Sequence, residues 1–105
     1  MYGHSFGGAA TLEVMKQDDR VSAGLTLDGA IGSDILPESF NKAFLMMLAE
    51  ESFAENTSKQ LLNISGEDGY LLTIMGSTHY AFTDVGLLMS HFIPLIPPQY
   101  LLFGT

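Results

Sequence analysis

The sequence contains no cysteine. Disulfide bonds, thiolate metal ligands and a cysteine nucleophile are therefore excluded. Positive charge is also scarce, because 4 Lys and Arg residues stand against 12 Asp and Glu residues in a chain of 105, with a formal net charge of -8. The few cations are scattered, so no basic patch offsets the repulsion of a polyanion. The composition predicts that nucleic acid is not a partner.

Long apolar runs and metal-binding spacings are missing as well. No apolar stretch approaches the ~18 residues of a membrane-spanning helix. The histidines and acids form neither H-x-H nor H-E-x-x-H, so we expect no metal ion and no other cofactor. No signal peptide is visible, and the sequence leaves the cellular compartment open. The apolar segments 92–96 and 100–103 are compatible with contact with a lipid surface, or with core side chains that have lost packing partners.

Apolar residues make up 47% of the chain, and their arrangement predicts alternating strands and helices. The nearly continuous apolar runs predict strands that are buried on both faces of a parallel sheet. The expected strands are 21–27, 43–49 and 70–75, and the expected helices run to about Gln17, over 53–64 and over 84–92 with Thr83 as cap. This alternation predicts an α/β fold in which helices flank a parallel sheet.

The segment Gly3-His4-Ser5-Phe6-Gly7 fits the pattern G-x-S-x-G. That pattern requires a sharp strand-to-helix turn that exposes the serine hydroxyl, and we expect a side chain at either glycine to collide with the neighbouring strand and helix. The helix that follows places the Phe6 amide where it can stabilise an oxyanion. A plain glycine-rich turn or a phosphate-binding loop is the alternative, although the latter lacks its G-x-x-x-x-G-K-[ST] signature.

A serine nucleophile needs a histidine base oriented by a carboxylate, and the chain order Ser, acid, His is expected for this type of turn. Among the histidines, His4 lies inside the turn and is not expected to reach the Ser5 hydroxyl, and His91 falls late in a predicted helix. His79 follows the third predicted strand and is the candidate base. The acid is either Asp28 or the pair Glu50 and Glu51, because both positions follow predicted strands. The spacing leaves this choice open.

Three segments together resemble the family of platelet-activating-factor acetylhydrolases of isoform II. They are GHSFGGAAT, LTLDGAI and TIMGSTHYAFTDVGLL, in the order and spacing of that family. The resemblance implies an α/β-hydrolase fold in which Ser5 is the nucleophile, Asp28 the orienting acid and His79 the general base. It also implies hydrolysis of the sn-2 acetyl or short acyl ester of a phospholipid, without calcium. The substrate is thus a small-molecule ester or a phospholipid.

The resemblance implies in addition that residues 1–105 are the C-terminal part of one α/β-hydrolase domain. The N-terminal strands, the loop that donates the second oxyanion hydrogen bond and the C-terminal helix are expected to be missing. Loss of one oxyanion donor costs roughly a hundred- to a thousandfold in rate, so this chain alone is expected to be a poor enzyme. A generic short-chain or dienelactone-hydrolase-like esterase and a non-catalytic binding module remain the alternatives.

Overall fold

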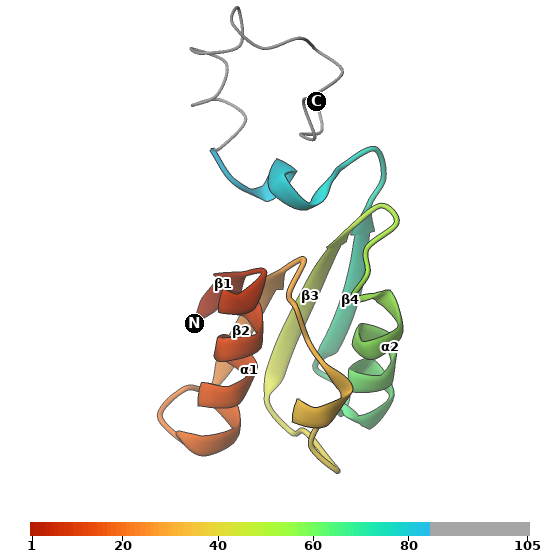
Figure 1. Ribbon diagram of the computed structural model, residues 1–105. Coiled ribbons are helices and arrows are strands. Elements are labelled where there is room, and N and C mark those ends of the chain that lie inside the picture. Colours follow the sequence, from red (N-terminus) through yellow and green to blue (C-terminus); the bar gives the residue numbers. More distant parts are fainter. Residues whose placement is uncertain (85–105) are drawn as a thin grey trace, which may run out of the picture.

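Four parallel strands form one sheet in the computed structural model, which describes residues 1–84 (Figure 1). The strands are β1 (Tyr2–His4), β2 (Ala23–Leu27), β3 (Ala43–Ala49) and β4 (Gly69–Ile74), and their order in the sheet is β1-β2-β3-β4. Every neighbouring pair is parallel. The predicted α/β class with a parallel sheet is confirmed, as a partial α/β-hydrolase-like arrangement with flanking helices.

Helices connect the strands, as parallel pairing requires. They are α1 (Phe6–Gln17) and α2 (Glu55–Ile64), with short 3-10 helices η1 (Ser33–Ile35) and η2 (His79–Phe82). The first helix ends at the predicted residue, and η1 lies between β2 and β3. The Thr83 hydroxyl donates to the Tyr80 carbonyl at 2.8 Å and Thr83 ends η2. The helix predicted over 84–92 lies outside the described residues, apart from Asp84.

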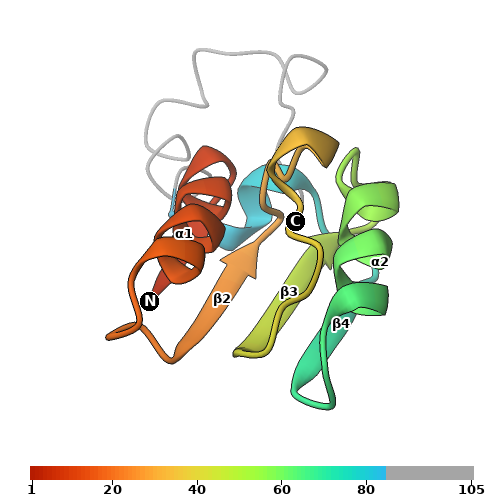
Figure 2. The same cartoon turned by 90° about the horizontal axis from the view of Figure 1, so that it is seen from below.

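The core lies between one face of the sheet and the helices, which Figure 2 shows gathered on that side. Burial alternates along β3, where Phe44, Met46 and Leu48 are buried and the residues between them are only partly so. The buried cluster consists of Leu12, Met15, Ile31, Phe40, Phe44, Met46 and Leu61. The expectation that 21–27 and 43–49 are buried on both faces is therefore wrong for the described part of the chain, because α1 and α2 cover the same face.

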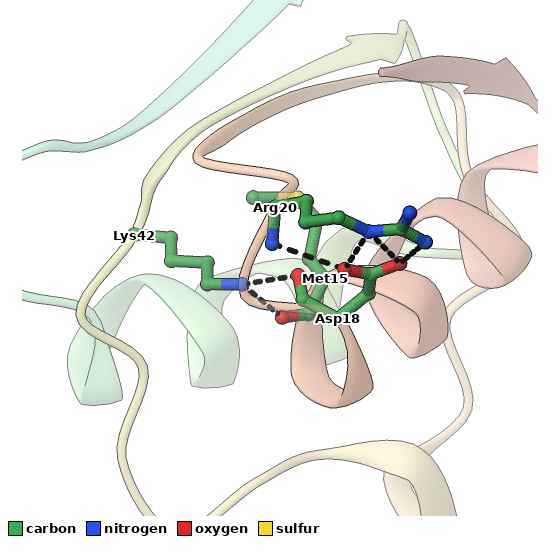
Figure 3. Close-up of polar contacts among 4 residues, drawn as sticks. All are labelled: Met15, Asp18, Arg20 and Lys42. Carbon is green, nitrogen blue, oxygen red and sulfur yellow. Dashed lines mark hydrogen bonds and ion pairs between the residues drawn. The ribbon is translucent and has the colours of Figure 1, made fainter.

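The end of α1 is bound to the segment before β3 (Figure 3). The Lys42 ammonium donates to the carbonyl oxygens of Met15, at 2.6 Å, and Asp18, at 2.9 Å. Carbonyls at the end of a helix lack intrahelical partners, and a cation also interacts favourably with the helix dipole there. Asp18 pairs in addition with Arg20 at 2.7 Å, at the surface. Within residues 1–84, no helix has the length and apolarity needed to cross a membrane.

Candidate active site

Ser5 occupies a sharp turn between β1, which ends at His4, and α1, which begins at Phe6. Its φ of 56° and ψ of -121° are unfavourable for a residue with a side chain. Backbone hydrogen bonds hold this conformation: the Ser5 amide donates to Leu27 at 3.2 Å, and the Ser5 carbonyl accepts from Gly8 at 2.9 Å and Ala30 at 2.8 Å. The turn is thus attached both to its own helix and to β2 and the segment after it.

The glycines around Ser5 differ in how much room a side chain would have at each position. A Cβ on Gly3 would lie 2.0 Å from the Gly7 carbonyl oxygen, so Gly3 cannot be replaced without moving the first turn of α1. A Cβ on Gly8 would lie 2.7 Å from the Cα of Gly29, which shows how closely the helix approaches the segment after β2. Among the described residues nothing lies within 4 Å of a Cβ on Gly7. The expected collision at Gly7 is therefore wrong for this part of the chain.

Asp28 is the first residue after β2 and is only 1% exposed. Its φ of 48° lies in the left-handed region, which Asp and Asn tolerate better than most residues. The Asp28 amide donates to the Met47 carbonyl at 2.7 Å, and its Oδ1 accepts from the Ala49 amide at 3.1 Å. The carboxylate is thus held at the carboxyl edge of the sheet by the end of β3.

The environment of Asp28 favours its ionised form. Burial raises the pKa of this carboxyl. Hydrogen bonding to the Ser52 and His79 side chains and to the Ala49 amide lowers the pKa by more than burial raises it, so that the pKa lies below its ordinary value. Hydrogen bonds to a carboxylate favour the charged state because they stabilise the negative oxygen atoms. Asp28 is therefore a carboxylate that accepts hydrogen bonds at neutral pH.

His79 contacts Asp28 directly, although His79 begins η2, after β4, and Asp28 directly follows β2. The distance from His79 Nδ1 to Asp28 Oδ2 is 2.6 Å. A carboxylate can only accept, so Nδ1 bears the proton and, in the neutral ring, Nε2 retains a lone pair. The His79 side chain is 24% exposed, and the rings of His4, Phe53 and Tyr80 surround it with centroids 4.5, 5.6 and 5.2 Å away.

The other predicted site atoms are less closely connected. In the described part of the chain, no hydrogen bond joins the Ser5 hydroxyl to His79, and the Phe6 amide has no acceptor. Such hydrogen bonds are often formed only when substrate is bound. Glu50 accepts from the Gly76 amide at 2.7 Å. Of the carboxylates that the sequence left as candidates for the acid, it is thus Asp28 that contacts His79.

The described residues line two cavities outside the predicted site. One, of about 280 Å³, is lined by the residues that follow β3 and β4. The other, of about 320 Å³, lies near Lys42, before the start of β3. Neither is lined by Ser5, Asp28 or His79. Within residues 1–84, no cluster of three or more His, Asp or Glu side chains has the arrangement of a metal site.

Two contributors to this region were not identified from the sequence. His4 donates from its ring to the His79 carbonyl oxygen at 2.7 Å, and the Ser52 side chain helps to lower the pKa of Asp28. The sequence indicates only that His4 does not reach the Ser5 hydroxyl as a base, and it predicts no other role for this residue. Its place directly before Ser5 in the sequence is the signal that could have indicated a supporting role. No sequence pattern distinguishes Ser52.

Comparison with known proteins identifies the family to which this chain belongs. The model of the family "Platelet-activating factor acetylhydrolase, isoform II" matches residues 1–96. The platelet-activating factor acetylhydrolase of Gallus gallus is 32% identical over 87 residues, which are 78% of this chain and 21% of the relative. That of Canis lupus familiaris is 31% identical over 86 residues, 78% of this chain and 19% of the relative.

A third relative, from Arthroderma benhamiae, is named a probable 1-alkyl-2-acetylglycerophosphocholine esterase. It is 53% identical over 34 residues, which are 32% of this chain and 9% of the relative. The chain spans about a fifth or less of the length of these curated relatives. The matched residues show that the chain belongs to the family of platelet-activating factor acetylhydrolases of isoform II.

Proposed function

We propose that this chain bears the nucleophile and the acid–base pair of a serine ester hydrolase that acts on phospholipids of the platelet-activating-factor type. The observation that supports this most directly is the 2.6 Å contact between His79 Nδ1 and the buried Asp28 carboxylate. The family membership and the name of the Arthroderma relative suggest the substrate, a glycerophosphocholine with an acetyl or short acyl ester at its sn-2 position.

In the proposed reaction, His79 Nε2 removes the proton of the Ser5 hydroxyl while the Ser5 oxygen attacks the carbonyl carbon of the ester. The resulting oxyanion accepts a hydrogen bond from the Phe6 amide, at the start of α1. The tetrahedral intermediate then breaks its bond to the glycerol oxygen, which takes the proton from His79 and leaves as the lyso-phospholipid. Water, activated by the same histidine, hydrolyses the acyl group from Ser5 and restores the enzyme.

Three local features support this assignment. The Asp28 contact keeps the proton of neutral His79 on Nδ1, which leaves Nε2 free to act as base. The lowered pKa of Asp28 keeps its charge available to the imidazolium that forms during the reaction. The strained backbone of Ser5 and the free amide of Phe6 in the described part of the chain are typical of a nucleophile elbow.

The nucleophile is tested by labelling the intact protein with a fluorophosphonate probe. We expect covalent labelling at Ser5, because only a serine activated by a base reacts readily. Ser5→Ala should abolish labelling, whereas Ser39→Ala, which changes an exposed serine before β3, should leave it unchanged. Labelling that persists in Ser5→Ala would refute the assignment. An unlabelled but folded wild-type protein would favour the alternative of a non-catalytic binding module.

The acid is tested by comparing Asp28→Asn with Glu51→Gln. Asparagine tolerates the left-handed backbone at position 28 but favours the wrong His79 tautomer, so we expect kcat for a short-chain ester to fall by about ten-thousandfold. Glu51→Gln should retain near-normal turnover. The reverse result would transfer the acid role to the loop after β3. Equal activity on simple esters and on phospholipids would favour a generic short-chain esterase.

A further inference from the structure

His4 contacts the segment that contains the proposed base, at a point other than the proposed reacting atoms. Its Nε2 lies 2.7 Å from the backbone carbonyl oxygen of His79. A carbonyl oxygen can only accept, so this contact requires a hydrogen on Nε2 of His4 and thereby assigns its tautomer when the ring is neutral. His4 is also the residue directly before Ser5, at the end of β1.

The ring of His4 lies against side chains of the same segment. Its centroid is 4.5 Å from that of His79, 6.4 Å from that of Tyr80 and 6.5 Å from that of Phe82. All three of these residues belong to η2. His4 therefore combines one hydrogen bond to the η2 backbone with ring contacts to η2, and both fix η2 relative to the turn that contains Ser5.

The contact between His4 and His79 joins segments that belong to the two outer strands of the sheet, β1 and β4. The strand order places β1 and β4 at opposite edges, which are three strand spacings or roughly 14 Å apart. The segment after β4 must therefore cross the end of β3 before His79 reaches Asp28 and His4 (Figure 1). Because η2 lies so far from β4, it needs attachments to the strands that it reaches, and His79, its first residue, provides them.

We propose that His4 is a positioning residue that holds His79 by its backbone, while Asp28 holds it by its ring. This inference rests on the proposed function, since it assigns the purpose of the contact to the orientation of the base. Two attachments, one on the carbonyl and one on Nδ1, restrict both the place of the His79 backbone and the rotation of its ring. In this role His4 acts through His79, by its hydrogen bond to the His79 backbone and its ring contact, and takes no part in proton transfer.

The test separates the two contributions of the His4 ring with a pair of variants. His4→Phe retains an aromatic ring but removes the donor, whereas His4→Gln retains an N–H donor at a similar distance from the backbone. Because a small displacement of a catalytic group can cost about a hundredfold in rate, we expect kcat/KM of the intact protein to fall by about that factor in His4→Phe and to be largely restored in His4→Gln. Substrate binding should change little in either variant.

A second readout follows His79 itself. With ring-¹⁵N-labelled histidine, NMR of the wild-type protein at neutral pH should show His4 protonated on Nε2 and His79 protonated on Nδ1, with slow exchange of the His79 Nδ1 proton. We expect that exchange to become faster in His4→Phe and to remain slow in His4→Gln. A merely structural role of His4 would alter the unfolding temperature without this selective pattern.

Several results would overturn the proposal. They are a wild-type His4 protonated on Nδ1 at neutral pH, unchanged His79 exchange in a folded His4→Phe variant, and a His4→Gln variant as impaired as His4→Phe. The tautomer measurement uses only the wild-type protein, so the test remains decisive if His4→Phe does not fold. Failure of Ser5 labelling alongside the expected His79 exchange pattern would instead refute the proposed function and leave the contact established.

Discussion

At the scale of the residue, Asp28 combines a left-handed backbone, nearly complete burial and a network of hydrogen-bond donors. Burial of a carboxylate is costly unless its oxygens are hydrogen-bonded. Here Oδ1 accepts from the Ala49 amide and Oδ2 from the His79 ring. The same donors that make burial tolerable also orient His79.

The lowered pKa of Asp28 predicts how acid affects folding. The folded pKa lies below the ordinary value of 3.8, so as pH falls through that value the unfolded chain binds this proton before the folded one does. The contribution of Asp28 is therefore complete above pH 3.8 and is lost as pH falls further, towards the lowered folded pKa. Urea unfolding between about pH 5 and about pH 2.5 should show a steeper loss of stability in the wild-type protein than in Asp28→Asn. Parallel curves for the two proteins would contradict this prediction.

At the scale of the element, the end of α1 is stabilised both by a local side-chain contact and by a residue that is distant in the sequence. Lys16 is the one basic residue of its last turn, and it forms an ion pair with Glu13 at the surface. The carbonyls of Met15 and Asp18 instead bind Lys42, from a segment more than twenty residues later. This contact also fixes the start of β3 against the end of α1.

Replacing Lys42 by Met should destabilise the fold while retaining most of the aliphatic side chain. We expect the free energy of unfolding to fall by about 1 kcal/mol, since two helix-terminal carbonyls lose a charged donor. Arg20→Met removes a cation whose side chain is 89% exposed, and it should leave the urea midpoint unchanged. An equal loss in both variants would show that charge in general, rather than this contact, stabilises the region.

At the scale of the whole molecule, the helices of the described residues cover one face of the sheet (Figure 2). Adjacent residues of β4 show the consequence, because Leu71 packs against the core cluster while Leu72 is 48% exposed. Tyr70 and Ile74 share the face of Leu72 and are exposed too. In residues 1–84, this second face is thus apolar without a helix over it.

The two leucines provide a matched test of this arrangement. Threonine is favourable in strands, so Leu71→Thr and Leu72→Thr differ mainly in the side-chain contact that is lost. We expect Leu71→Thr to lower the free energy of unfolding of this chain by about 1.5 kcal/mol. Leu72→Thr should change it by less than about 0.5 kcal/mol. An equal or larger loss at Leu72, measured by urea unfolding, would mean that the second face is covered.

The sequence by itself determined the α/β class, the end of α1 at Gln17 and the strand-to-helix turn at Ser5. These follow from periodicity and from the sizes of neighbouring residues, which act over a few positions. It also placed Asp28 and His79 at strand ends, where parallel strands bring loops to one edge. The residues alone did not choose between Asp28 and the glutamates after β3; only the resemblance to a family did.

Only the tertiary structure decided which side chains meet. Asp28 and His79 are 51 positions apart, and His4 and His79 are 75 apart. Such contacts depend on strand order and on the path of the segment after β4, neither of which is encoded in a local pattern. For the same reason the burial of both sheet faces was predicted wrongly, because an apolar strand does not specify on which side its connecting helices pack.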